Sequence, residues 1–357
     1  TSITFLIFAG ILLILAGIYF ISRGAGRGRV IVSAILVVAC CVFGHSDSFA
    51  FWESELAYEG ESVYNYLQVK EDDDSVVLST NVLFGVQSIL KKNEELTGMY
   101  YDYAMAAPYM AGIHEKGGLK CLILGMGTGT FAEQCRRYFP SSKSLGVEID
   151  EKITAIAREF FRLPSDIPIV TYDGRAFLQS IDQTFDVIMV DAYQDITIPF
   201  QMASVEFFTL VRDHLKPDGV LVVNMNMRGR GEETINSYLA DTISTQFSEI
   251  YTIDVEWSTN RELFASNSSE MLQNFKDSRA ALAKDGSYES RELSSFMRRF
   301  DSSLIKYQPS DLVMTDDKAP VELLSMRAID GIISDEVAYF RDIYKEQGIK
   351  GVIDALN

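Results

Sequence analysis

Three carboxylates in this chain each follow a short apolar stretch. They are Glu148 in SLGVEID, Asp173 in IPIVTYDG and Asp191 in FDVIMVDAY. Acids at the carboxyl ends of buried strands face ligands, and a glutamate there can hold the two hydroxyls of a ribose. An aspartate can accept a hydrogen bond from the exocyclic amine of adenine. Asp191, at the rim of a partly desolvated pocket, suits a general base or an anchor for an ammonium group.

Each of these positions also has a purely structural alternative. A strand-terminal acid can cap the next helix, and Asp150 could do so in place of Glu148. Asp173 could cap a helix that begins near Arg175. Tyr193, beside Asp191, could form a wall of the pocket or simply pack. The chemical and the structural roles are compatible for Asp173.

A glycine-rich loop lies ahead of the first acid. In the segment Leu119–Asp150 an apolar strand is followed by Gly125, Gly127 and Gly129, then by an amphipathic helix and a second strand. Glycines let a ligand approach the helix N-terminus, and Glu148 lies about 20 residues further on, at the spacing of a ribose-binding acid. The unit predicts an adenosyl-type ligand.

The elements that must position these residues follow a regular alternation. Residues 119–227 contain five apolar segments separated by helical stretches: CLILG, SLGVEID, IPIVTYDG, FDVIMVDAY and GVLVVNMN. This alternation predicts a mostly parallel sheet with helices on both faces. YTIDVEW and ELFASN predict an antiparallel hairpin at its edge, and the chain beyond them is mainly helical.

A small β-rich lead-in is predicted ahead of this sheet. VYNYLQV (Val63–Val69) and SVVLSTN (Ser75–Asn81) are separated by the acidic turn EDDD, which is a hairpin pattern.

The N-terminus is unusually apolar. Ile3 to Ile21 has no charged residue and is long enough to span a hydrocarbon layer of about 30 Å. With a second apolar run from Val30 to Gly44, it predicts a transmembrane hairpin and a multi-pass location in the cell membrane; a cleaved signal peptide is the alternative. Arg23, Arg27 and Arg29 lie between the runs, so the positive-inside rule places the rest of the chain on the extracytoplasmic side.

The charge balance limits the partners. With 50 acidic and 32 basic residues the chain has a net charge of −18. A nucleic-acid partner is disfavoured because phosphate contacts need clustered Lys or Arg, whereas a small cationic substrate would be attracted. Most of the charge has a simpler cause, an acidic solvated surface. The four cysteines and three histidines form no ligand pattern, so we expect no metal site, no disulfide framework and no Ser-His-Asp triad.

Eight sequence blocks, in order, carry a family resemblance. Between Glu61 and Asn267 they are ESVYNYLQV, FGVQS, YYDYAMAAP, LILGMGTG, GVEID, YDGRAFL, DVIMVDAY and EFF. The series resembles the spermidine synthase (polyamine aminopropyltransferase) family, in which a small β-rich piece precedes a methyltransferase-like, Rossmann-like sheet. MTDDKAPVELL (Met314–Leu324) resembles the membrane-fused branch of that family.

The resemblance implies an α/β fold in three parts. Residues 1–51 would form two transmembrane helices, residues 52–115 a β-rich subdomain, and residues 116–357 a synthase-like α/β domain with a helical C-terminal part. Family members often form dimers, so a homodimer is a possible assembly.

The resemblance also implies an activity. An aminopropyl or related alkyl group would pass from decarboxylated S-adenosylmethionine, or from S-adenosylmethionine, to a small cationic amine, and no tightly bound cofactor is expected. Amines with a pKa near 10 are protonated at neutral pH, so a carboxylate must orient the ammonium and take its proton. Asp191 matches the family's catalytic aspartate.

Matching the blocks assigns the remaining roles. Glu148 would bind ribose, Asp173 adenine, Gln87 the aminopropyl region, and Tyr100 (or Tyr101) with Asp102 the polyamine channel. The resulting site has Asp191, Tyr100 and Asp102 in catalysis, and nine residues in cosubstrate binding: Gln87, Gly125, Gly127, Thr128, Gly129, Glu148, Asp173, Gly174 and Tyr193.

Three positions depart from the family pattern. Thr128 stands where the glycine loop usually carries an acid for the cosubstrate's amine. Gln194 stands at the second acid of the catalytic segment, with Asp195 one step later, and Asn65 replaces a usual glutamine. Two lost carboxylates would weaken the binding of two cations.

The departures leave other functions open. One is an extracytoplasmic enzyme on the same scaffold that performs nucleotide-independent acid/base chemistry on an amine or peptide. Another is a non-catalytic domain that binds a polyamine or nucleoside. A methyltransferase fits the glycine loop but fits the FGVQS and YYDY blocks less well.

Overall fold

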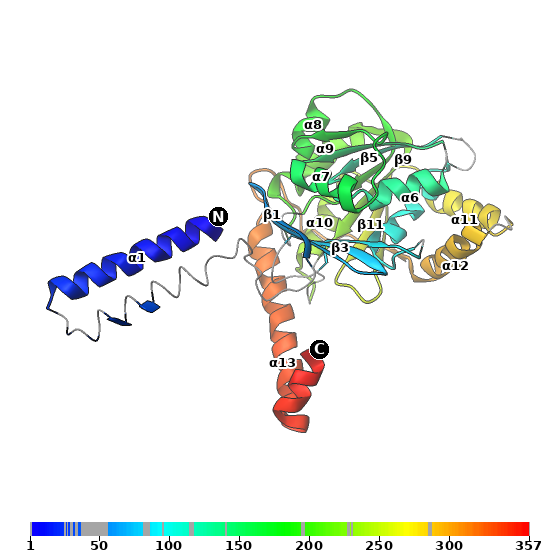
Figure 1. Cartoon of the computed structure of the whole chain (residues 1–357). Coiled ribbons are helices and arrows are strands. Elements are labelled where there is room, and N and C mark those ends of the chain that lie inside the picture. Colours follow the sequence, from blue (N-terminus) through cyan, green and yellow to red (C-terminus); the bar gives the residue numbers. More distant parts are fainter. Residues whose placement is uncertain are drawn as a thin grey trace.

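A computed structural model gives the structure of the chain (Figure 1). It describes residues 2–24, 26, 28, 31–32, 35–36, 56–80, 86–94, 96–113, 118–139, 141–193, 197–226, 229, 231–284 and 288–356.

A four-stranded antiparallel sheet comes first in the main body of the fold. Its strands follow chain order: β1 (Leu56–Glu61), β2 (Tyr66–Glu71), β3 (Ser75–Ser79) and β4 (Ser88–Lys91). β2 pairs with β3 across the acidic turn, which confirms the predicted hairpin.

The second sheet has eight strands in the described residues, in the order β12-β10-β11-β9-β8-β5-β6-β7. The five predicted strands form its parallel part. They are β5 (Lys120–Leu124), β6 (Lys143–Glu148), β7 (Ile169–Thr171), β8 (Phe185–Val190) and β9 (Leu215–Met225). The predicted antiparallel hairpin is β10 (Glu249–Asp254) with β11 (Arg261–Ser266), and the short β12 (Ile305–Lys306) lies outside it.

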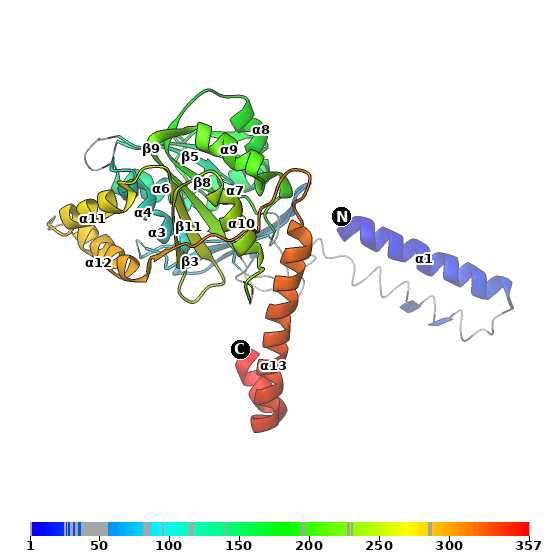
Figure 2. The same ribbon diagram turned by 180° about the vertical axis from the view of Figure 1, so that it is seen from behind.

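The parallel strands are apolar on both faces because helices cover both (Figure 2). Ile123 and Met189 pack into one core, while Leu124 and Val190 pack into the other. Helices of the first core include α3 (Tyr100–Ala104), α4 (Ala106–Met110), α6 (Thr130–Tyr138), α11 (Met271–Leu282) and α12 (Tyr288–Ser303). Helices of the second include α8 (Gly174–Gln179), α9 (Val205–Asp213) and α10 (Ile235–Ser244), with the 3-10 turn η1 (Phe200–Met202).

Helix α7 (Glu151–Phe160) links the two sheets. Its Ile153 and Ile156 pack with Leu67 and Leu78 of the small sheet in a third apolar cluster. The small sheet is thereby held against the carboxyl ends of the parallel strands.

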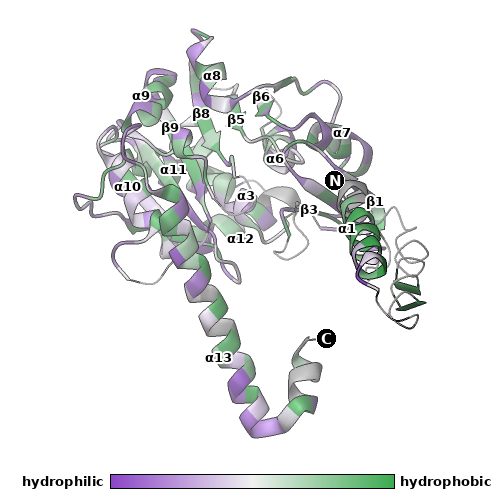
Figure 3. Cartoon of the chain, turned by 90° about the vertical axis from the view of Figure 1, so that its left-hand side faces the viewer, coloured by the Kyte–Doolittle hydropathy of each residue, from purple (hydrophilic) through white to green (hydrophobic). Residues whose placement is uncertain are grey.

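The C-terminal helix α13 (Val321–Leu356) packs on the body only at its start. Val321 and Leu324 join the second core, and the helix then extends away from the sheet (Figures 1 and 3). The backbone departs from helical geometry at Gly348.

The first helix, α1 (Ser2–Ser22), carries exposed apolar side chains such as Phe8 and Ile18 (Figure 3). Within the part of the chain that the structure describes, no helix is both long enough and apolar enough to cross a membrane. The predicted transmembrane hairpin and the multi-pass, extracytoplasmic location are therefore wrong. Most of the second run, Val30–Gly44, lies outside the described residues.

Candidate active site

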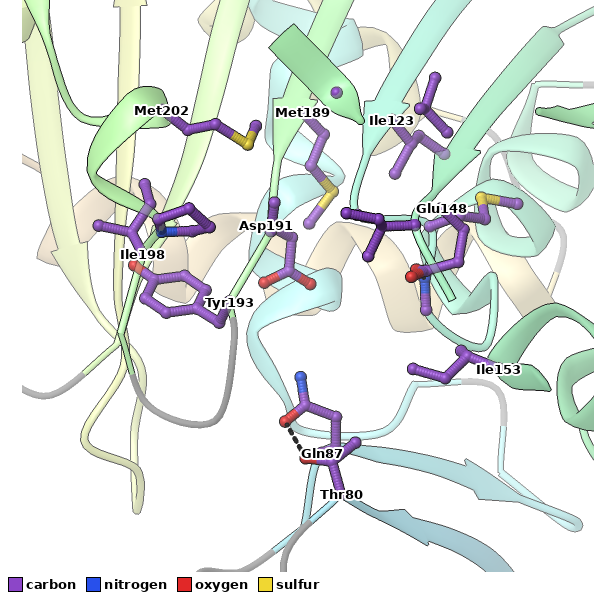
Figure 4. Close-up of a pocket in the computed structure, with 18 of the residues that line it drawn as sticks. Thr80, Gln87, Ile123, Glu148, Ile153, Met189, Asp191, Tyr193, Ile198 and Met202 are labelled. Carbon is purple, nitrogen blue, oxygen red and sulfur yellow. Dashed lines mark hydrogen bonds between the residues drawn. The ribbon is translucent and has the colours of Figure 1, made fainter. Parts of the chain in front are cut away.

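A cavity of about 410 Å³ lies at the carboxyl ends of β5 to β8, facing the small sheet (Figure 4). Open α/β sheets hold ligands at this edge. Of the twelve residues assigned from the sequence, eleven line it: Gln87, Tyr100, Gly125, Gly127, Thr128, Gly129, Glu148, Asp173, Gly174, Asp191 and Tyr193.

The glycine loop connects β5 to α6, and all three glycines have positive φ. At Gly125 a Cβ atom would lie 2.3 Å from the main-chain oxygen of Asp191, so only glycine fits between these strand ends. At Gly129 it would lie 2.4 Å from a methyl carbon of Leu163. Gly127 has open space beside it, with Ser88 Oγ at 3.9 Å. The loop therefore leaves room for a ligand above Gly127.

Glu148 ends β6 and is held by main-chain donors. Its Oε2 accepts from the Gly127 N–H at 2.9 Å and its Oε1 from the Asp150 N–H at 3.0 Å. Burial raises the pKa of Glu148, although both hydrogen bonds act in the opposite direction. The carboxylate is thus fixed beside the glycine loop, where a diol can reach it.

Asp150 performs the capping role that the sequence left open. It accepts from the Lys152 N–H at the start of α7 and also from Ser62 and Asn65 of the small sheet, at 2.5 and 3.0 Å. Asn65, one of the three departures, therefore ties the β1–β2 turn to α7 next to Glu148.

Asp173 caps α8 and lines the cavity at the same time. Its Oδ1 accepts from the Ala176 N–H at 2.8 Å. Gly174 lies close to Leu124 and Met202, where a Cβ atom would be 3.2 Å from the Met202 methyl carbon. Among the residues that the structure describes, no protein group donates to the second oxygen of Asp173, so a ligand amine could use it.

Asp191 is the most strongly perturbed acid in the cavity. Its Oδ2 accepts from the Tyr100 hydroxyl at 2.6 Å and its Oδ1 from the Asn224 amide at 2.8 Å. Burial raises the pKa of Asp191 to about 7; the two hydrogen bonds lower it and the charge of Glu148 raises it. A base whose pKa lies near the working pH is well matched to proton transfer. Figure 4 shows its carboxylate pointing into the cavity between Tyr193 and Glu148.

Asn224 and Asn260 form a hydrogen-bonded pair behind Asp191 to which no sequence motif pointed. Asn224, near the end of β9, accepts at its Oδ1 from Asn260 at 2.7 Å while its amide holds Asp191. Tyr193 donates to the Asn224 carbonyl at 2.5 Å and accepts from the Asn226 N–H at 3.0 Å. From the sequence, the role of Asn224 could have been inferred only from its position near the end of the strand that pairs with β8.

Gln87 and Thr128 both line the cavity, from the small sheet and from the glycine loop respectively. Gln87 belongs to the small-sheet side, where Thr80 donates to its Oε1 at 3.5 Å (Figure 4). Thr128 is buried in the glycine loop and its hydroxyl pairs with that of Thr130 at 3.1 Å. Neither supplies a charge. Gln194 and Asp195 lie outside the described residues.

The structure does not bring Asp102 to this cavity. Asp102 is fully buried on α3 and accepts from the Gly98 N–H, the Thr97 hydroxyl and the Gln134 amide. It faces away from Tyr100, toward a second hollow on the other side of the helix. Because residues one and two apart on a helix point in different directions, Tyr100 and Asp102 cannot share one face.

Two further wall segments contain none of the residues assigned from the sequence. The stretch 197–202, which includes η1, contributes six consecutive lining residues. Glu322, in the first turn of α13, also lines the cavity. The ion pair between Arg175 and Asp316, at 2.6 Å, fastens the segment before α13 to α8.

Comparisons with known proteins identify the family of the chain. A family model described as "Spermine/spermidine synthase domain" matches residues 103–265. A "Probable polyamine aminopropyl transferase" of Bifidobacterium longum is 51% identical over 350 residues, which cover 95% of this chain and 78% of that protein.

Solved structures share the fold. A probable spermidine synthase from Corynebacterium glutamicum is 20% identical, with a TM-score of 0.53, and the match covers 73% of this chain and 100% of that one. A spermidine synthase in complex with the transition-state analogue AdoDATO is 19% identical, with a TM-score of 0.52, over 70% of this chain and 87% of that one. The predicted family and α/β fold are confirmed. The chain therefore belongs to the spermine/spermidine synthase family, the polyamine aminopropyltransferases, and is an enzyme of the transferase class.

Proposed function

We propose that the cavity binds decarboxylated S-adenosylmethionine and a small cationic amine, and transfers the aminopropyl group between them with Asp191 as general base. The observation that carries the proposal is the state of Asp191, which is partly buried, held at both oxygens, and has a pKa raised to about 7. A carboxylate with that pKa is largely ionised above neutral pH, yet accepts a proton more readily than an ordinary aspartate.

The reaction needs a neutral amine. The substrate arrives as an ammonium, pairs with Asp191, and gives it one proton. The freed nitrogen lone pair then forms a bond to the propyl carbon next to the sulfonium. The carbon–sulfur bond breaks, its electron pair stays on sulfur, and methylthioadenosine leaves as a neutral thioether.

The nucleoside half has a matching set of groups. Glu148, beside Gly127, suits the ribose hydroxyls, and Asp173 with Gly174 suits the adenine edge. The apolar side chains of Ile198 and Met202 are placed to cover a ring (Figure 4). Tyr193 would form the wall next to the reacting carbon.

The aminopropyl ammonium has fewer charged contacts. Gln87 and Thr128 offer only neutral oxygens, so the charge of the donor's amine would be balanced mainly by Asp191 and Glu148. We therefore infer weaker discrimination against a donor that differs at this amine, including S-adenosylmethionine itself.

Calorimetry with decarboxylated S-adenosylmethionine, S-adenosylmethionine and methylthioadenosine tests the proposal directly. Decarboxylated S-adenosylmethionine and methylthioadenosine should both bind, and Glu148→Gln should weaken both by at least about tenfold, the cost of one charge-assisted hydrogen bond. The matched control is Glu151→Gln, an exposed change at the start of α7. If none of the three ligands binds at millimolar concentration, the proposal is wrong.

A further inference from the structure

A buried glutamate lies behind the proposed base. Glu262 belongs to β11 and its side chain is fully buried. In the described part of the chain neither of its carboxyl oxygens has a hydrogen-bond partner. An ionised carboxylate buried without a partner costs several kcal/mol, and such groups become neutral instead. An unpaired acid at this position therefore needs an explanation.

The strand register places Glu262 next to the hydrogen bonds of the active site. Its cross-strand partners are Asn224 on β9 and Ile253 on β10. Directly opposed residues on one face of a sheet are neighbours, with Cβ atoms about 5 Å apart. The Asn224 amide is the group that holds Asp191. Asn224 is therefore the residue that lies between Glu262 and the proposed base, Asp191.

The titratable groups around Glu262 are acids and phenols. Helix α3 packs on β11 and contributes Tyr100, and the segment after β8 contributes Asp191 and Tyr193. The charge of Glu262 raises the pKa of Tyr100 and Tyr193, and the charge of Asp191 raises the pKa of Glu262. Its two strand neighbours carry no charge, so ionisation of Glu262 would add a second negative charge beside Asp191.

We propose that Glu262 is a positioning residue that keeps its proton in the resting enzyme, so that the buried pair of Glu262 and Asp191 carries one negative charge, on Asp191. Two carboxyls in one buried site lose their protons in separate steps, and the less solvated one keeps its proton longer. A neutral Glu262 leaves Asp191 free to ionise and hold one substrate ammonium. Naming Asp191 as the base rests on the proposed function, but the protonation of Glu262 does not.

The proposal has a consequence for stability. Burial, followed by the charge of Asp191, raises the pKa of Glu262 well above its ordinary value. The unfolded chain ionises this group near its ordinary pKa, so the folded state loses stability as the pH rises from there toward the folded-state pKa. Glu262→Gln, which has the same shape and is always neutral, removes that loss.

Thermal unfolding checks this consequence without any substrate. Glu262→Gln should melt several degrees above the wild type at pH 8, and the gap should narrow at pH 5. The matched control is Glu256→Gln, an exposed glutamate in the β10–β11 turn, which should show no pH-dependent gap. A Glu262→Gln variant that is less stable than the wild type at pH 8 would overturn the proposal.

Infrared difference spectroscopy reads the proton itself. The wild type minus Glu262→Gln spectrum at pH 7 should contain the C=O band of a protonated carboxyl, and the Glu256→Gln difference should not. In an Asp191→Asn background the Glu262 band should disappear at a lower pH than with Asp191 present, because the neighbouring charge is gone. Absence of the band at pH 7, or an unchanged midpoint in Asp191→Asn, contradicts the pairing. Failure of the aminopropyl transfer alone would leave both spectra unaffected, so the two proposals fail separately.

Discussion

The hydroxyl of Tyr100 donates a 2.6 Å hydrogen bond to Oδ2 of Asp191, across 91 residues of sequence. The contact joins α3, which follows the small sheet, to the carboxyl end of β8. A phenol that is itself buried is a constant donor here, because burial and the Asp191 charge raise the pKa of Tyr100 well above its usual value. Tyr100 therefore favours the ionised form of the proposed base.

Removing this hydroxyl should raise the pKa of Asp191, so that the carboxyl becomes a stronger base and ionises only at a higher pH. A hydrogen bond to a charged group contributes about 1.5 kcal/mol or more. Tyr100→Phe should therefore move the midpoint of the acid limb of kcat/KM to a higher pH by about one unit. Tyr103→Phe, in the same helix but outside the cavity, is the control and should leave the limb in place. An unchanged profile in Tyr100→Phe would show that the bond does not act on the base.

Asn224 supplies the second hydrogen bond to Asp191. Asn224→Leu keeps the branched shape but removes the amide donor, so kcat should fall about tenfold and the midpoint of the acid limb of kcat/KM should move to higher pH. Binding of methylthioadenosine should change less than threefold, because Glu148 and the glycine loop are untouched. Asn274→Leu, a half-buried asparagine on α11, is the control. Equal losses in the two variants would point to general destabilisation.

Asp102 should behave as a structural acid. Burial raises its pKa to about 6, and its three donors belong to the Thr97–Gly98 turn and α6. Asp102→Asn should lower the midpoint of denaturant unfolding and reduce kcat by less than about tenfold, compared with a hundredfold or more expected for a catalytic acid or base. A loss of kcat as large as that of Asp191→Asn would show that Asp102 takes part in catalysis.

The glycine loop allows a test of close approach. Gly125 and Gly98 both have positive φ, so alanine at either one costs about 1 to 3 kcal/mol of strain. Only at Gly125 would the new methyl group also meet backbone, at 2.3 Å from the Asp191 oxygen, whereas Gly98 has nothing within 4 Å. Urea unfolding should therefore show a larger loss for Gly125→Ala than for Gly98→Ala. Similar losses would mean that the two strand ends can separate without cost.

Sequence patterns predicted the parallel sheet well because its strands are buried on both faces and read as apolar runs. The same strands carried Glu148, Asp173 and Asp191 at their ends, and the structure brings all three to one cavity. Their roles, the domain boundaries and a homodimer stay predictions.

Other features of the site depend on tertiary geometry and could not be predicted from the sequence. Asp102 lies two residues from Tyr100 in a motif, but a short helix turns it to the opposite side. Asn224 and Glu262 reach the site through β9–β11 pairing, which only the assembled sheet defines. The apolar N-terminus suggested a membrane hairpin from composition alone, and the described helices do not meet the required length and apolarity.

The pH dependence of kcat/KM in the wild type and in Asp191→Asn tests the central claim most directly. The acid limb of kcat/KM reports the pKa of the free enzyme's base, which we expect at about 7 for Asp191. Asp191→Asn should lose that limb and at least about a hundredfold in kcat, while it still binds methylthioadenosine and unfolds at the wild-type temperature. An Asp191→Asn enzyme with activity within tenfold of the wild type, and with the limb still in place, would show that another group takes the proton.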